Sequence, residues 1–139
     1  MSLDADFSLD SLKVLVVDDD VDNLQFLAFL FETYSAEVAA VSSADYAFQA
    51  VLEWRPDILV SNVSMPDVDG YMLIRRIRGL TVEQGGQVPA IALTANAKES
   101  DQLQALAAGF QQHLAKPVEQ DELLQAVLAL TANKATEAL

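Results

Sequence analysis

With 139 residues, 52% of them hydrophobic, the chain is long enough for one well-formed core and too short for two ordinary domains. It has no cysteine, which excludes disulfides and thiol catalysis, and a formal net charge of -13, which argues against direct binding of nucleic acid. No apolar stretch reaches the roughly 20 residues of a bilayer span and the N-terminus is acidic, so we expect a soluble, cytoplasmic protein with no membrane contact.

The first half of the chain contains two predicted β-α units. "KVLVV" at 13–17 is a short β-branched run, and 22–36 carries apolar residues at helical spacing. "EVAAV" at 37–41 is the second predicted strand. It precedes a helix at 42–54, with Ser42 or Ser43 as its N-cap and Arg55-Pro56 after its end.

The second half contains three more units. The predicted strands are 57–62, 88–94 and 112–115, and the helices that follow them are 71–80, 96–108 and 118–132, with Gly109 as the C-cap of the second. Strands that alternate with helices require crossover connections, which give a parallel sheet with helices on both faces. The predicted class is therefore a doubly wound α/β fold, with an N-terminal extension at 1–11, one domain at 12–132 and a tail at 133–139.

Polar residues follow four of the five predicted strands. They are Asp18, Asp19 and Asp20, then Asn62, Thr94 and Lys116. The carboxyl ends of parallel strands meet at one edge of the sheet, where ligands of such folds bind. Adjacent carboxylates repel each other unless a cation lies between them, so we expect Mg²⁺ at Asp18 and Asp19.

Each of these residues also has a purely structural interpretation. A carboxylate before a helix is commonly an N-cap, which we assign to Asp20. Thr94 alone would be an ordinary strand residue and Lys116 an ordinary loop residue. Together, however, a hydroxyl and an ammonium beside a carboxylate-bound metal can hold phosphate oxygens, and this combination favours a phosphoryl site.

The chain resembles the receiver (response-regulator) domains of two-component signalling, over about 13–130. The resemblance rests on "VLVVDDD", "PDILVSNVSMPDVDG", "AIALTA" and "HLAKP". It implies a five-stranded, flavodoxin-like (CheY-like) sheet of strand order 2-1-3-4-5. It also implies a phosphorylation-gated interaction switch with no enzymatic role, whose partner is a sensor histidine kinase or a phosphotransfer protein.

The resemblance also assigns roles to individual residues. Asp18, Asp19 and the backbone carbonyl of Ser64 would bind Mg²⁺, while Thr94 and Lys116 would contact the phosphoryl group.

The phosphoacceptor aspartate of the family is replaced here by Asn62, a weaker, neutral metal ligand. His113 occupies the place of an aromatic switch residue, although a half-exposed strand residue without that role explains it equally well.

Asn62 changes the expected chemistry because a neutral amide lacks the anionic oxygen that attacks phosphorus. We therefore expect phosphoryl acceptance to be lost and Mg²⁺ binding to be weakened. Two explanations remain open: a receiver-like binding module that works without phosphorylation, or an ordinary receiver whose acceptor was recently or deliberately replaced. The presence of the other strand-end residues slightly favours the second.

Two further alternatives come from other features. Asp18 and Asp20 have the D-x-D spacing of haloacid-dehalogenase-like phosphatases, but Asp22 and the lack of a second acidic pair argue against that class. The first helix is more apolar than one buried stripe requires, which suits either a docking face or deep burial, and we prefer burial. The resemblance implies that this helix and the last one meet the phosphodonor, and that helices four and five can form a homodimer.

Overall fold

A computed structural model describes residues 8–63, 69–95 and 99–132 of the chain. The strands are β1 (Lys13–Val17), β2 (Glu37–Val41), β3 (Ile58–Asn62), β4 (Ala90–Thr94) and β5 (Gln112–Ala115). The helices are α1 (Val21–Thr33), α2 (Ala44–Trp54), α3 (Gly70–Arg78), α4 (Glu99–Ala108) and α5 (Gln120–Leu130). The predicted alternation of five strands with five helices is confirmed.

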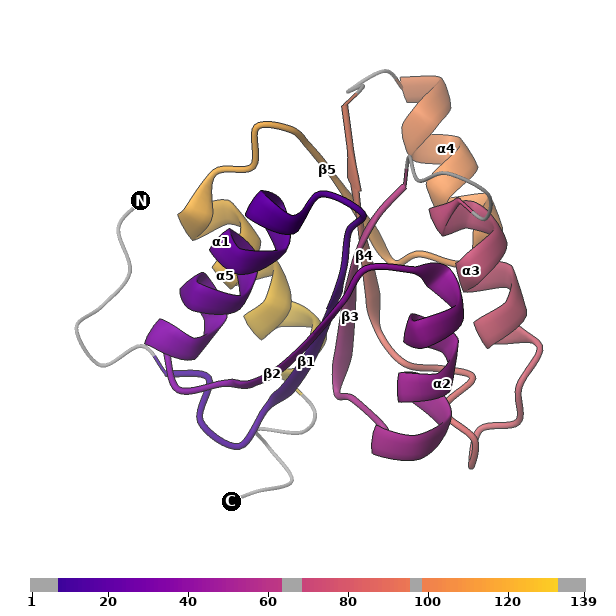
Figure 1. The fold of residues 1–139 in the computed structure, drawn as a ribbon. Helices are drawn as coiled ribbons and strands as arrows, with labels where there is room; N and C mark the ends of the chain where they lie inside the picture. The colour runs from indigo at the N-terminus through magenta and orange to yellow at the C-terminus, as the bar shows by residue number, and fades with distance from the viewer. Residues whose placement is uncertain (1–7, 64–68, 96–98, 133–139) are drawn as a thin grey trace.

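The five strands form one parallel sheet in the order β2-β1-β3-β4-β5. This is the order that the resemblance implied, with β1 and β3 near its centre. Figure 1 shows α1 and α5 on one face of the sheet and α2, α3 and α4 on the other. Strand β2 lies on one side of β1 and the later strands lie on the other, so the strand order reverses between β1 and β3. The carboxyl ends of these two strands are therefore the expected place for a site.

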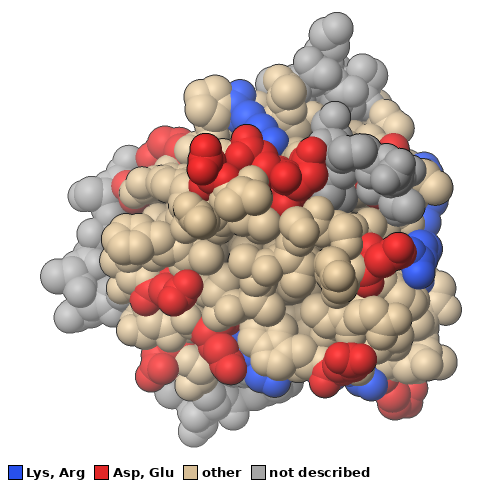
Figure 2. All heavy atoms as spheres, in the orientation of Figure 1, with Lys and Arg blue, Asp and Glu red and all other residues tan. Residues whose placement is uncertain are grey.

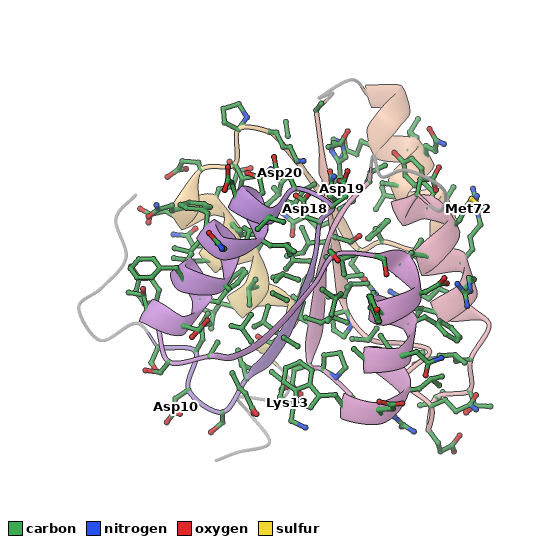
Figure 3. All side chains as sticks on the ribbon, viewed as in Figure 1. Asp10, Lys13, Asp18, Asp19, Asp20 and Met72 are labelled. Carbon is green, nitrogen blue, oxygen red and sulfur yellow. The ribbon has the colours of Figure 1, made fainter. Side chains whose placement is uncertain are left out.

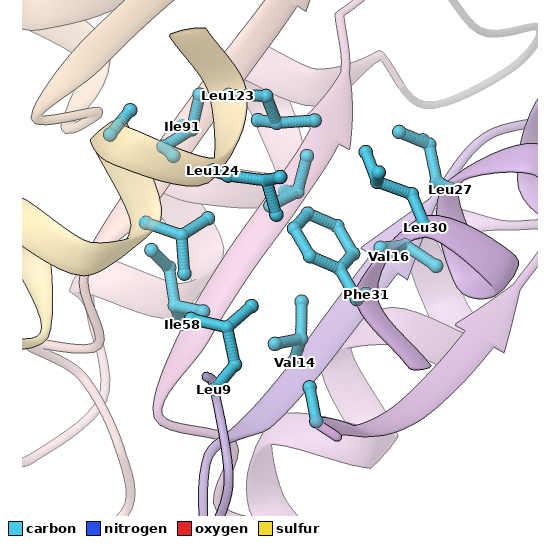
Figure 4. Packing of buried hydrophobic residues seen from close by; sticks show 14 of the residues in the cluster. Leu9, Val14, Val16, Leu27, Leu30, Phe31, Ile58, Ile91, Leu123 and Leu124 are labelled. Carbon is cyan, nitrogen blue, oxygen red and sulfur yellow. The ribbon is translucent and has the colours of Figure 1, made fainter. Parts of the chain in front are cut away.

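Each face of the sheet has its own apolar core. Val14, Val16 and Ile58 point toward α1 and α5, where they meet Phe31 and Leu124 (Figure 4). The intervening strand residues point the other way, toward α2, α3 and α4; among them are Leu15, Val17 and Leu59. Strand side chains alternate between faces, so near-continuous apolar strands serve both cores at once.

The ends of the helices agree closely with their sequence signals. Asp20 caps α1 by accepting from the backbone N–H groups of Asp22 and Asn23, and Ser43 caps α2. Gly109 follows α4 with φ of +130°, a conformation that favours glycine. Helix α3 begins one residue before its predicted start and ends at Arg78, because Asp69 caps it and Gly79 closes it.

The segment before β1 contributes to the core. Leu9 is buried among the side chains under α1 and α5, and its backbone N–H donates to the carbonyl of Tyr34 at 2.7 Å. Part of the predicted extension at 1–11 therefore packs against the domain.

Helix α1 is not buried as deeply as its composition led us to expect. Leu24, Leu27 and Phe31 face the sheet, but Phe26 is 43% exposed and Phe29 is 73% exposed. Our preference for deep burial of the whole apolar helix is wrong for these two rings, because a helix on an outer layer covers the sheet with one stripe only. Within the described part of the chain, no helix combines the length and apolar character needed to cross a bilayer.

Two arginines of α3, Arg76 and Arg78, have specific partners in neighbouring elements. Arg76 pairs with Asp45 at 2.9 Å and lies 4.4 Å from the centre of the Phe48 ring. Arg78 donates to the carbonyls of Gly86 and Gly109, and burial lowers its pKa. These contacts join α3 to α2 and to the turns beside it.

Candidate acceptor site at the carboxyl edge of the sheet

The strand ends converge as the sequence predicted. Val17 pairs with Ser61 across β1 and β3, so Asp18 and Asn62 follow at adjacent positions of the same edge. The backbone N–H of Lys116 donates to the carbonyl of Thr94 at 2.7 Å, which fixes the residue after β5 beside the end of β4. Backbone pairing alone therefore brings these four residues to one edge.

The side chain of Asn62 is the centre of the polar contacts. Its Nδ2 donates to Oδ1 of Asp18 and to Oδ1 of Asp19, both at 3.3 Å. Its Oδ1 accepts from Nζ of Lys116 at 2.7 Å. Asn62 is 5% exposed, so these bonds form in a largely desolvated place where a lost partner is costly. The amide thus connects the acidic pair to the lysine.

Asp18 is the most buried carboxylate of the site, with 1% of its surface exposed. Burial raises the pKa of this carboxyl, and the neighbouring Asp19 carboxylate acts in the same direction. A hydrogen bond from the backbone N–H of Asp20 and the charge of Lys116 oppose the rise. Oδ2 of Asp18 is buried without a hydrogen-bond partner among the described residues, and Nζ of Lys116 lies 3.8 Å from it.

The acidic residues near the end of β1 form a local charge cluster. Figure 3 places Asp18, Asp19 and Asp20 together above the end of the central strands, and Figure 2 shows acidic side chains gathered at the top of the same face. Asp19 and Asp20 are exposed, unlike Asp18. The carboxylates of Asp18 and Asp19 suit a hard cation such as Mg²⁺, which is bound through one or two carboxylates and keeps several waters.

The fit to a divalent cation is nevertheless incomplete. The described residues contain no group of three His, Cys, Asp or Glu side chains that could hold a metal ion. Residue 62 presents its amide nitrogen, a donor, to both carboxylates. The Ser64 carbonyl expected as a further ligand lies outside the described residues. The orphan Oδ2 of Asp18 fits a cation, whereas the present orientation of Asn62 does not.

The remaining predicted residues have different environments. Thr94 is buried at the end of β4, on the same edge as Lys116. His113 is half-buried in β5 beside Ala92 of β4, and its Nε2 makes no hydrogen bond with the described residues. His113 thus lies in the strand next to that of Thr94, and its role as a switch stays a prediction.

A pocket of about 520 Å³ opens beside the acidic pair. Asp18 and Lys116 form its polar side, and Phe26, Leu27 and Pro117 belong to its apolar wall. Phe26 of α1, which is only partly covered, therefore lies on the wall of this pocket. The pocket connects the charged edge of the sheet with the exposed apolar surface of α1.

Gly70 is a supporting residue that sequence reasoning missed. It begins α3, and its backbone N–H donates to the carbonyl of Val63 at 2.8 Å. A β-carbon here would lie 2.7 Å from the carbonyl oxygen of Asn62 and 2.8 Å from Cα of Val63, both of them backbone atoms. The stretch "VSMPDVDG" contains the glycine, but only the fold reveals that α3 packs directly against the strand end that carries Asn62.

Comparison with known proteins agrees with this geometry. The sequence model of the response regulator receiver domain matches residues 14–128. An uncharacterized 14.6 kDa protein of Leptolyngbya boryana, from the sodA1 3' region, is 42% identical over 120 residues, which cover 86% of this chain and 90% of that protein. The sensor protein GacS of Pseudomonas syringae pv. syringae is 35% identical over 120 residues, but this chain spans only 13% of its length.

A solved structure gives the same fold together with a metal. The receiver domain of a sensor histidine kinase from Pseudomonas aeruginosa PAO1, which has a magnesium ion coordinated in its active site cleft, matches with a TM-score of 0.79 and 30% identity. The match covers 87% of this chain and 98% of that domain. The strand order and the matched sequence agree, and the chain belongs to the response regulator receiver domain family.

Proposed function

We propose that this receiver domain is a protein-interaction module of two-component signalling that does not accept a phosphoryl group at residue 62. The observation that carries the proposal is the Asn62 amide, held between the acidic pair and Lys116 at the end of β3. Its nitrogen lone pair is delocalised into the carbonyl, and its oxygen is neutral and already accepts from an ammonium. Residue 62 therefore has no nucleophile for phosphorus.

The neighbouring residues would still suit a bound phosphoryl group. Lys116 and Thr94 lie at the same edge, where an ammonium and a hydroxyl can hold phosphate oxygens. A cation at Asp18 and Asp19 would supply charge neutralisation for that group, as the family resemblance implies. In this chain, we expect Thr94 and Lys116 to contact no covalently bound phosphoryl group, because residue 62 cannot form the bond to phosphorus.

The proposed partner is a sensor histidine kinase or a phosphotransfer protein, with α1 as the docking surface. Phe26 and Phe29 support this role because α1 exposes both rings, and Phe26 also lines the pocket. Contiguous exposed apolar patches mark interaction surfaces, whereas scattered single residues do not. On the far side of the molecule, Leu103 is 59% exposed and Leu106 is 45% exposed on α4, which suits a homodimer through α4 and α5.

The decisive experiment is phosphorylation by acetyl phosphate with Mg²⁺, followed by intact mass spectrometry. The unaltered chain, Asn62→Asp and Asn62→Ala are treated in parallel, and the Ala variant reports any reaction at other sites. We expect a hydroxylamine-sensitive phosphoryl adduct on Asn62→Asp alone. An adduct of the same stability on the unaltered chain but not on Asn62→Ala would refute the proposal.

The same experiment distinguishes the two origins of Asn62. If Asn62→Asp gains the phosphoryl group, the neighbouring residues still support phosphoryl transfer, and the amide of Asn62 alone prevents it. If Asn62→Asp remains unmodified, Asp18, Thr94 and Lys116 no longer support phosphoryl transfer, and a binding module that has worked without phosphorylation for longer is the better description. The exposed rings of α1 favour continued partner binding in either case.

A further inference from the structure

The Asn62 amide lies between groups of opposite hydrogen-bonding character. On one side are two carboxylate oxygens, of Asp18 and Asp19, which only accept. On the other side is the Lys116 ammonium, which only donates. Nitrogen must therefore face the acids and oxygen must face the lysine, so both sides impose the same orientation on the amide.

No other residue type of this size satisfies both sides. An aspartate at residue 62 could accept from Lys116 but would bring a third carboxylate against Asp18 and Asp19, which requires a cation or a proton. A leucine or alanine would leave the buried carboxylate of Asp18 without one of its donors. The amide alone supplies a donor to the acids and an acceptor to the lysine.

From this polarity match we propose that the Asn62 amide performs the task that otherwise requires a cation, holding the carboxylates of Asp18 and Asp19 together, and that Mg²⁺ binds only when the amide rotates away from Lys116. The inference rests on the proposed function, because it concerns the same silent acceptor position. It identifies Asn62 as the residue that sets the metal requirement of the domain.

The coupling to Lys116 follows from the two ends of the amide. A divalent cation between the two carboxylates would meet the N–H donors of Nδ2, which repel it, so the amide must rotate and turn Oδ1 toward the acids before the cation binds. That rotation directs Nδ2 at the Lys116 ammonium, donor against donor, and breaks the 2.7 Å bond. A cation must therefore displace one charge-assisted bond to Lys116 and two bonds to carboxylates before it gains its ligand.

The first test compares thermal stability with and without a divalent cation. In the presence of a chelator, we expect Asn62→Asp to melt several degrees below the unaltered chain, because three carboxylates then face one another. Saturating Mg²⁺ should raise the melting temperature of Asn62→Asp strongly and that of the unaltered chain little. Gln49→Glu, an exposed change on α2 with the same change in net charge, controls for overall charge.

The second test measures how strongly the hydrogen bond between Asn62 and Lys116 opposes Mg²⁺ binding. Mg²⁺ affinity is determined by calorimetry for the unaltered chain, Lys116→Ala, Asn62→Asp and the double variant. Loss of the ammonium should favour the cation electrostatically in both backgrounds. The gain should be about tenfold larger with Asn at 62, because the amide has a single oxygen and must give up its bond to Lys116 when it turns that oxygen toward the cation, whereas a carboxylate has a second oxygen for Lys116. The Asn62 side-chain amide resonances should shift on metal binding in the same titration.

The outcomes separate this inference from the proposed function. Equal melting temperatures of the unaltered chain and Asn62→Asp in chelator, or equal gains of Mg²⁺ affinity in the two backgrounds, would overturn the inference while the phosphorylation result stands. An unaltered chain that accepts the phosphoryl group would overturn the proposed function, whatever its melting temperature. We expect that residue 62 accepts no phosphoryl group, that the unaltered chain melts above Asn62→Asp in chelator, and that Lys116 lowers its affinity for Mg²⁺.

Discussion

The two ends of the sheet each bring a lysine and an aspartate together, with opposite results. At the amino end, Nζ of Lys13 donates to the carbonyl of Trp54, the last residue of α2, and lies 5.4 Å from the centre of its ring. Oδ2 of Asp57 accepts from the backbone N–H of Lys13 at 2.8 Å, and the backbone N–H of Asp57 donates to the Lys13 carbonyl at the same distance.

The carboxyl end is arranged differently. The Lys116 ammonium approaches Oδ2 of Asp18 only to 3.8 Å and is bonded to Asn62 instead, so this buried carboxylate oxygen has no hydrogen-bond partner among the described residues. Figure 3 shows the two places at opposite ends of the central strands, with Lys13 at one and Asp18 at the other. Paired polar groups at the amino end thus stabilise the fold, whereas the carboxyl end keeps a buried charge that the fold itself does not need.

A change that disturbs the backbone at the carboxyl end of the sheet should destabilise the domain most. Gly70→Ala places a β-carbon 2.7 Å from the Asn62 carbonyl oxygen, and neither strand nor helix backbone can move aside cheaply. We expect a loss of about 3 kcal/mol in the free energy of unfolding, at the upper end of the cost of overpacking. Urea unfolding followed by the fluorescence of the single tryptophan, Trp54, measures it.

Gly79→Ala is the matched control for this substitution. Gly79 has φ of -76°, and a β-carbon there would approach nothing closer than 3.4 Å, the carbonyl oxygen of Arg76. Its stability should be unchanged or higher by up to about 1 kcal/mol, because alanine restricts the unfolded chain. Equal losses at Gly70 and Gly79 would show that α3 does not support the strand end that carries Asn62.

A smaller effect is expected at the amino end. Asp57→Ala removes the side-chain acceptor of the Lys13 backbone N–H, a partly buried donor, and should cost about 1 to 2 kcal/mol of unfolding free energy. Asp45→Ala is the control, since its pair with Arg76 is largely exposed and should contribute about 0.5 kcal/mol or less. If Asp57→Ala is as mild as Asp45→Ala, the amino end is not held together by these bonds.

Much of this fold could be predicted from residue patterns. The alternation of β-branched runs with helical periodicity predicted ten elements, and local caps such as Asp20, Ser43 and Gly109 set several of their ends. The strand order did not follow from periodicity, because hydrophobic spacing reports which face is buried and not which strand is the neighbour. The resemblance to receiver domains supplied that order.

The sequence predicted which residues form the site but not which of their atoms contact one another. Parallel strands place Asp18, Asn62 and Lys116 at one edge, so their meeting follows from topology. The direction of the Asn62 amide depends on side-chain positions that no spacing encodes. The exposure of Phe26 and Phe29 was missed for a similar reason: an all-round apolar helix does not reveal which stripe the sheet covers.

The last prediction concerns the isosteric change Asp18→Asn. Its effect on the free energy of unfolding should be opposite in sign to that of losing an aspartate at the amino end of the sheet. Burial raises the pKa of Asp18 above its ordinary value of 3.8, so the folded state holds this proton more tightly than the unfolded state. The contribution of Asp18 to stability is therefore fully present below the unfolded pKa and is lost as the pH rises through the folded pKa. At neutral pH and in chelator, Asp18→Asn should be slightly more stable than the unaltered chain, and the gain should vanish in acid.

This sign sets the carboxyl end apart, because loss of an aspartate at the amino end should destabilise the domain. In Asp18→Asn, the side-chain amide oxygen can still accept from the backbone N–H of Asp20, so the local turn is retained. Unfolding free energies of both chains, measured from acid to neutral pH in chelator, test the prediction. A variant that is less stable at neutral pH would mean that the Lys116 charge, 3.8 Å away, outweighs the burial of Asp18, and that both ends of the sheet serve the fold.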